Sequence, residues 1–92
     1  MGVAAAIERK LTDAFRPLRL TVTDESHKHK GHAGARPEGE SHFHVEIVSA
    51  AFAGKSRVER QRLIYATLAE EMAGSVHALA TKILTPDEDA IT

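Results

Sequence analysis

The sequence contains no cysteine, no tryptophan and only four phenylalanine or tyrosine residues among its 92 positions. Without cysteine the chain has neither a disulfide framework nor a Cys/His nucleophile. Its formal net charge of −1 excludes a general attraction to nucleic acid, so such binding would need a local basic patch. No hydrophobic run approaches the roughly 18 residues of a membrane span, and the amino terminus lacks a signal-peptide pattern. We therefore expect a cytoplasmic protein with no membrane segment.

The length fits one small domain spanning residues 1–92. We expect an ordered core over about residues 3–86, a long loop over residues 25–40 that glycine and proline interrupt, and an acidic, frayed tail over residues 87–92. A loop of that length in a small domain is usually functional or disordered.

Hydrophobic spacing predicts the first helix and two strands. A four-residue repeat predicts a helix that ends at Arg16-Pro17, and its hydrophobic members are Val3, Ile7, Leu11 and Phe15. Alternation then predicts a strand through Leu18, Leu20 and Val22. A second strand follows over residues 42–48, with a core face made by Phe43, Val45 and Ile47.

The second half of the chain predicts a helix and a final strand. Ser56 and Glu59 fit a capping box at the start of the helix. Its expected hydrophobic stripe consists of Val58, Ile64, Tyr65, Leu68 and Met72. Gly74 is the expected left-handed end of this helix, and residues 76–84 read as a strand. Together with a helical turn near residues 50–54, the elements predict an α+β fold in which helices cover one face of a mixed three-stranded sheet.

Five of the six histidines lie between His27 and His44. Imidazole binds borderline metals, so His27, His29 and His32 in the long loop are either metal ligands or polar filler. Alternating ligands at His42, His44 and Glu46 fit either a zinc site with an open position or a solvated strand face. His77, at the start of the final strand, is equally compatible with packing and with function. No Ser/His/Asp arrangement can be assembled, so we expect no enzyme activity.

Basic residues surround the start of the second long helix: Lys55, Arg57, Arg60 and Arg62. Gly54-Lys55-Ser56 is not the end of a phosphate-binding loop, because the position of the first glycine of that motif is Ser49. Helix amides favour anions, so these side chains form either a local phosphate-binding surface or a solvated charged face.

Several fragments, taken in order and spacing, resemble the BolA family over about Ile7 to Pro86. They are Asp24-Glu25-Ser26, Glu40-Ser41-His42-Phe43-His44-Val45, Ile47-Val48-Ser49, Phe52-x-Gly54, Arg57-Val58-x-Arg60-x-Arg62-x-x-Tyr65 and Val76-His77-Ala78-Leu79-Ala80. The resemblance implies a class II KH-like fold with the order helix, strand, strand, helix, helix, strand, which agrees with the order predicted from hydrophobic spacing.

The resemblance also implies a function as an adaptor. BolA-like proteins pair with a monothiol glutaredoxin and share a [2Fe-2S] cluster with it and with glutathione, while the isolated chain, a monomer or weak homodimer, holds no cofactor. By this resemblance His77 is one cluster ligand. The second is a loop residue, for which Gly31-His32-Ala33 indicates His32, with His29 as the alternate. Mixed cysteine and histidine ligation raises the cluster potential.

The alternative implied by the family is a DNA-binding transcriptional regulator. It would use the helix-turn-helix-like segment from Phe52 to Tyr65 and the basic residues Lys55, Arg57, Arg60 and Arg62. KH domains grip nucleic acid with Gly-x-x-Gly, whereas this chain has Gly54-Lys55-Ser56-Arg57 and lacks the second glycine. This departure weakens the case for RNA binding and leaves DNA as the alternative partner.

Overall fold

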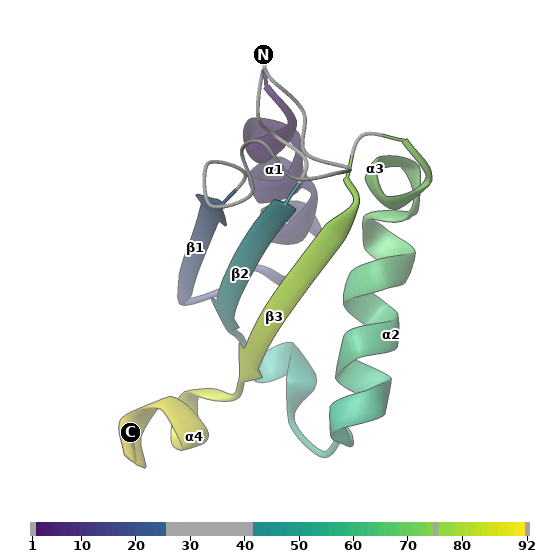
Figure 1. Ribbon diagram of the computed structural model, residues 1–92. Coiled ribbons are helices and arrows are strands. Elements are labelled where there is room, and N and C mark those ends of the chain that lie inside the picture. The colour runs from purple at the N-terminus through teal and green to yellow at the C-terminus, as the bar shows by residue number, and fades with distance from the viewer. Residues whose placement is uncertain (1, 26–41, 75, 92) are drawn as a thin grey trace.

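The computed structural model describes residues 2–25, 42–74 and 76–91, which form a three-stranded sheet with accompanying helices (Figure 1). The elements, in chain order, are α1 (Val3–Phe15), β1 (Arg19–Asp24), β2 (His42–Val48), the short 3₁₀ helix η2 (Ala50–Phe52), α2 (Arg57–Thr67), α3 (Ala69–Ala73), β3 (Ala78–Leu84) and α4 (Pro86–Ile91). None of the helices in these ranges is long and apolar enough to cross a bilayer.

The sheet has the order β1-β2-β3 and is mixed, as predicted. β1 and β2 are antiparallel, with Val22 opposite Val45, whereas β2 and β3 are parallel, with Val45 opposite Thr81. Both parallel strands therefore begin at the same end of the sheet, beside α3, and finish at the other end, near α4 (Figure 1).

One core cluster joins the sheet to the helices. Phe43, Val45 and Ile47 are buried as the alternation predicted, because the side chains of every second residue point to the same face of a strand. They pack with Ile7 and Leu11 of α1, Phe52 of η2, Ile64 of α2, and Leu68 and Val76. Helices α1 and α2 thus cover one face of the sheet.

The predicted start of α2 is confirmed, but its predicted stripe and end are partly wrong. Ser56 and Glu59 form the reciprocal capping box. Val58 and Tyr65 lie outside the core, with 53% and 38% of their surfaces exposed. Tyr65 is instead positioned by its hydroxyl, which donates a hydrogen bond of 3.1 Å to the carbonyl oxygen of Leu79.

The chain from Leu68 to Gly74 also differs from the prediction of one continuous helix. Leu68 leaves helical geometry, with φ −103° and ψ 23°, and separates α2 from α3. Gly74 has φ −111°, so it is not a left-handed terminator. Leu68 is fully buried. The break therefore falls at a core contact, which local spacing could not indicate.

The expectation of a frayed acidic tail is wrong, because residues 86–91 form α4. The Glu88 amide donates to Oγ1 of Thr85 at 3.2 Å, and the Thr85 amide donates to Oε1 of Glu88 at 2.8 Å. This is a second capping box, and Pro86 occupies the first helical position, where no amide donor is needed. The signal was present in the sequence as Thr85-Pro86-Asp87-Glu88.

Candidate functional site

The first candidate site is the end of the sheet at which β3 begins. His77 is exposed and directly precedes β3. The neighbouring Val76 is 4% exposed, and its amide donates to the Glu71 carbonyl oxygen at 3.0 Å. The Glu71 carboxylate in turn pairs with Nζ of Lys10 on α1 at 2.8 Å. The backbone that carries His77 is therefore anchored to two helices while its imidazole faces solvent.

A second imidazole lies beside His77. His42 begins β2 and pairs with Ala78, the residue after His77, in the parallel register. The two rings are stacked, with centroids 6.2 Å apart and planes 29° apart. From sequence, His42 was grouped with His44 and Glu46. Its proximity to His77 follows from the strand register, which a single sequence does not specify.

The residues that flank the span 26–41, Glu25 and His42, both lie at the end of the sheet that carries His77 and His42. The Glu25 amide donates to the His42 carbonyl oxygen at 2.8 Å, so the chain leaves and re-enters the described structure at this end. The predicted ligands His32 and His29, together with His27, lie outside the described residues.

The zinc hypothesis for residues 42, 44 and 46 gains no support from the geometry. Within the described ranges, no group of three or more metal-binding side chains comes together. Glu46 instead pairs with the guanidinium of Arg19, which lowers the pKa of that carboxyl group. Arg19 also contacts Asp89 of α4 at 2.6 Å, so this part of the outer sheet face holds an ion-pair network.

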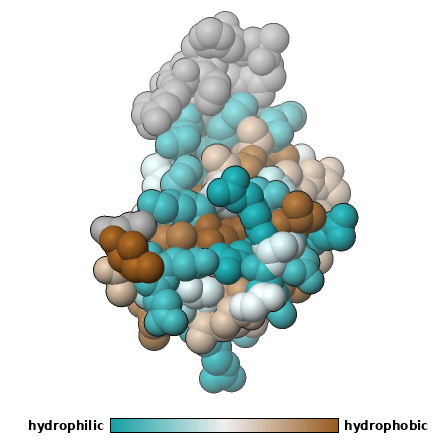
Figure 2. All heavy atoms as spheres, turned by 90° about the horizontal axis from the view of Figure 1, so that it is seen from below, coloured by the Kyte–Doolittle hydropathy of each residue, from teal (hydrophilic) through white to brown (hydrophobic). Residues whose placement is uncertain are grey.

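The second candidate site is a groove of about 730 Å³ at the opposite end of β3, between that strand and the start of α2. Its lining residues are Lys55, Arg57, Arg60, Gln61, Thr81, Lys82, Ile83, Leu84 and Glu88. Seen from this end, the molecule is largely hydrophilic with separate hydrophobic patches (Figure 2). Four cationic residues and a single carboxylate line the groove, so it attracts anions.

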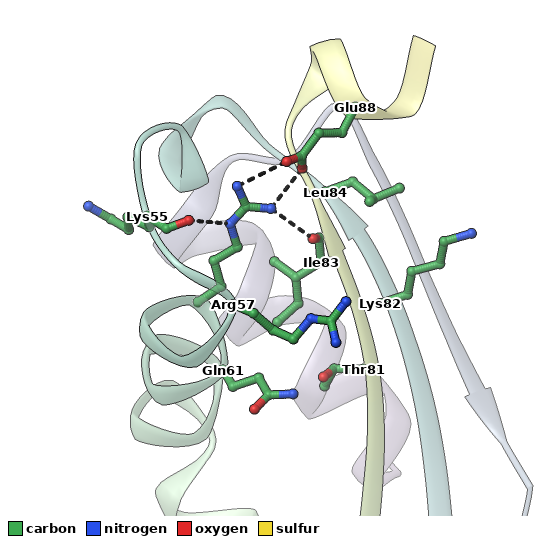
Figure 3. A pocket seen from close by; sticks show the side chains of 9 residues that line it. Lys55, Arg57, Gln61, Thr81, Lys82, Ile83, Leu84 and Glu88 are labelled. Carbon is green, nitrogen blue, oxygen red and sulfur yellow. Dashed lines mark hydrogen bonds and ion pairs between the residues drawn. The ribbon is translucent and has the colours of Figure 1, made fainter. Parts of the chain in front are cut away.

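Arg60 is the most constrained cation of this groove, with 13% of its side chain exposed. Its Nη1 and Nη2 donate to the two Glu88 oxygens at 2.7 and 3.2 Å. Nε donates to the Lys55 carbonyl oxygen at 3.0 Å, and Nη1 also donates to that of Ile83 at 3.2 Å (Figure 3). The hydrogen bonds that Glu88 accepts from the Arg60 guanidinium and from the Thr85 amide lower its pKa to about 2.

The other predicted basic residues are placed differently. Arg57 reaches from α2 toward β3, while the ammonium groups of Lys55 and Lys82 point away on opposite sides (Figure 3). Arg62 does not line the groove. Lys82 and Gln61 were missed from sequence, because only the packing of α2 beside β3 brings them to the same surface.

Comparison with known proteins then identifies the family. A family model described as BolA-like protein matches residues 11–88. This chain belongs to the BolA family. It is 47% identical over 88 residues to the DNA-binding transcriptional regulator BolA of Escherichia coli K12, covering 96% of this chain and 80% of that protein. BolA-like protein 1 of Homo sapiens is 48% identical over 84 residues, covering 91% of this chain and 58% of the human protein.

Solved structures of the BolA family have the same fold. The BolA domain of SufE1 from Arabidopsis thaliana superposes with a TM-score of 0.84 at 43% identity, covering 96% of this chain and 98% of that one. BolA1 from the same plant superposes with a TM-score of 0.86 at 39% identity, covering 96% of both chains. The predicted α+β, class II KH-like arrangement of this BolA-family chain is therefore confirmed.

Proposed function

We propose that this BolA-family chain is a cytoplasmic iron-sulfur adaptor that pairs with a monothiol glutaredoxin. In this role it shares a [2Fe-2S] cluster with glutaredoxin and glutathione. The observation that carries the proposal is an exposed imidazole, that of His77, on a backbone anchored by α1 and α3. A fixed backbone lowers the entropy lost when the ring binds iron at an interface.

The donor set of this end suits a shared rather than a private cluster. The chain has no thiolate to offer, and the described residues supply the two imidazoles of His77 and His42 at this end. A [2Fe-2S] cluster needs four ligands, so these two imidazoles cannot hold it alone, and in this proposal glutaredoxin and glutathione supply the thiolates. The resemblance to the BolA family implies His32, with His29 as the alternate, as the second ligand from this chain beside His77.

Anaerobic reconstitution tests this function. The chain is mixed with a monothiol glutaredoxin, glutathione, iron and sulfide, and the complex is followed by visible absorption and circular dichroism. We expect a heterodimer spectrum that differs from that of glutaredoxin alone and is lost in His77→Ala. His44→Ala is the matched control, since it removes an imidazole from β2 and leaves His77 unchanged. A spectrum unchanged by His77→Ala refutes the assignment.

A second candidate function is DNA binding by the basic groove. Two observations favour it: Lys55, Arg57 and Lys82 surround the groove, and the Escherichia coli relative carries the description DNA-binding transcriptional regulator. Gly54, with φ 76°, makes the turn that brings Lys55 to the start of α2. Such a groove binds mainly through phosphates, so its affinity should fall steeply with salt.

Fluorescence anisotropy with a labelled DNA oligonucleotide tests this second function. Arg57→Gln should weaken binding and flatten the dependence of log K on log salt. Arg62→Gln removes a similar charge from the same helix outside the groove, and we expect a smaller effect. Equal losses of DNA affinity in the two variants would show that binding depends on the overall positive charge of the helix and not on the groove.

A further inference from the structure

The groove contains its own carboxylate. Glu88 is the single acidic residue in its lining, and it binds Arg60 through two parallel hydrogen bonds of 2.7 and 3.2 Å. A guanidinium fork binds a carboxylate and a phosphate in the same bidentate way. Glu88 therefore occupies the position on Arg60 that a nucleic-acid phosphate would take.

We propose that Glu88 is an internal competitor that withholds Arg60 from nucleic acid and so limits the affinity of the groove for phosphate. The proposal rests on the second candidate function, DNA binding by this groove. It adds a regulatory role for α4, whose sequence was expected to form only a frayed tail.

Arg60 would stay in place if Glu88 were displaced. Its Nε and Nη1 groups also bond to the carbonyl oxygens of Lys55 and Ile83, which belong to the backbone. These two bonds fix the plane of the guanidinium and leave the Nη1 and Nη2 protons that now contact Glu88 available to a phosphate. The fork is thus already oriented, so its transfer from carboxylate to phosphate needs no rearrangement of α2.

Glu88 is presented by a fixed helix. Its capping bonds to Thr85 and the Arg19 contact to Asp89 anchor α4 at both the start and the middle. Because the pKa of Glu88 is lowered to about 2, the carboxylate keeps its charge throughout the physiological range. Competing anions, rather than a change of pH, would relieve this competition.

Glu88→Gln is the decisive variant, because glutamine still serves in a capping box while it removes the charge opposite Arg60. Asp87→Asn is the matched control: it makes the same charge change one residue earlier on α4, outside the groove lining. Both variants and the wild-type chain are titrated with a fluorescein-labelled single-stranded DNA oligonucleotide at several salt concentrations.

One extra phosphate contact should steepen the slope of log K against log salt by about 0.7 for single-stranded DNA. If affinity extrapolated to 1 M salt is unchanged, that slope corresponds to about an eightfold gain at 50 mM salt. We expect this gain in Glu88→Gln and not in Asp87→Asn. Adding Arg60→Gln to Glu88→Gln should remove the gain, since the new contact is made by Arg60.

The outcomes separate this proposal from the function on which it rests. If wild type binds DNA and the two single variants have equal slopes, Glu88 is only a structural partner of Arg60 and the proposal is wrong. If neither wild type nor Glu88→Gln binds, DNA binding itself fails and the proposal fails with it. Should Glu88→Gln not fold, Glu88→Asp keeps a capping carboxylate but withdraws it from Arg60, and the same gain is expected.

Discussion

The two ends of β3 offer opposite chemistry. At its start, His77 and His42 present two stacked imidazole rings. At its end, Arg60 holds four hydrogen bonds to one carboxylate and two backbone carbonyls. The contrast shows that β3 separates an end that carries two neighbouring imidazoles from an end that carries a partly buried ion pair and several cations.

The separation is large enough for independent action. β3 has seven residues, so it spans about 23 Å. The Debye length at physiological ionic strength is only about 8 Å. A charge change at one end of the strand should therefore have little direct effect on binding at the other, and the predictions below test that independence.

The largest expected effect is at the histidine end. His77→Ala should abolish the shared-cluster spectrum and leave the salt slope of DNA binding unchanged. His42→Ala, which removes the neighbouring ring, should weaken cluster retention without abolishing it, since His77 remains. Reconstitution and anisotropy on the same preparations check both results. A changed DNA slope in His77→Ala would contradict independence of the two ends.

The next effect is at the groove. The double substitution Arg57→Gln with Lys82→Gln removes two cations, so the slope for single-stranded DNA should fall by about 1.4 and affinity at 50 mM salt by about 60-fold. Cluster reconstitution with glutaredoxin should be normal. Loss of the cluster in this variant, despite a native circular dichroism spectrum, would mean that the two ends act as one site.

Acid should lower the stability of the fold by protonating Glu88 and breaking its ion pair with Arg60. Its pKa is lowered from the usual 4.5 to about 2 in the folded chain, so its pairing stabilises the fold fully above about pH 4.5. This contribution is lost as the pH falls from 4.5 to 2. Urea unfolding at several pH values should show a stability difference between wild type and Glu88→Gln that narrows across this window. A constant difference would show that the charge of Glu88 is not responsible.

The smallest effect concerns the start of α2, which carries the groove cations. Ser56→Ala removes the hydroxyl that accepts the Glu59 amide at 3.2 Å. Loss of such a cap costs about 1 kcal/mol. Thermal unfolding measures the cost, and Ser56→Asp, which restores a capping oxygen, should recover most of it. DNA affinity should decrease only in proportion to fraying of the first turn.

The predictable parts of this molecule are those that local sequence determines. Alternation placed Phe43, Val45 and Ile47 on the buried face, and the Ser56 box located the start of α2. Val58 and Tyr65 fit the helical stripe but remain exposed, so helical spacing alone did not determine which side chains of the stripe are buried.

The candidate sites depended more on tertiary contacts. His77 came from a family resemblance, whereas its neighbour His42 is separated from it by 35 positions and meets it only through the β2-β3 register. Arg60 was recognised as basic, but its partner Glu88 lies 28 residues later. The capping box of α4 that positions Glu88 could be predicted from sequence, since Thr85 and Glu88 have the same spacing as Ser56 and Glu59.

The hydrogen bonds from α2 to β3 have a consequence for self-association. β3 is an edge strand, and edge strands expose backbone groups to which another strand can add. Here Tyr65 binds the Leu79 carbonyl oxygen and Arg60 binds that of Ile83, on either side of Thr81. A foreign strand that approaches the β3 edge meets two carbonyl groups already bonded to side chains of α2, so α2 hinders strand addition at this edge of the sheet.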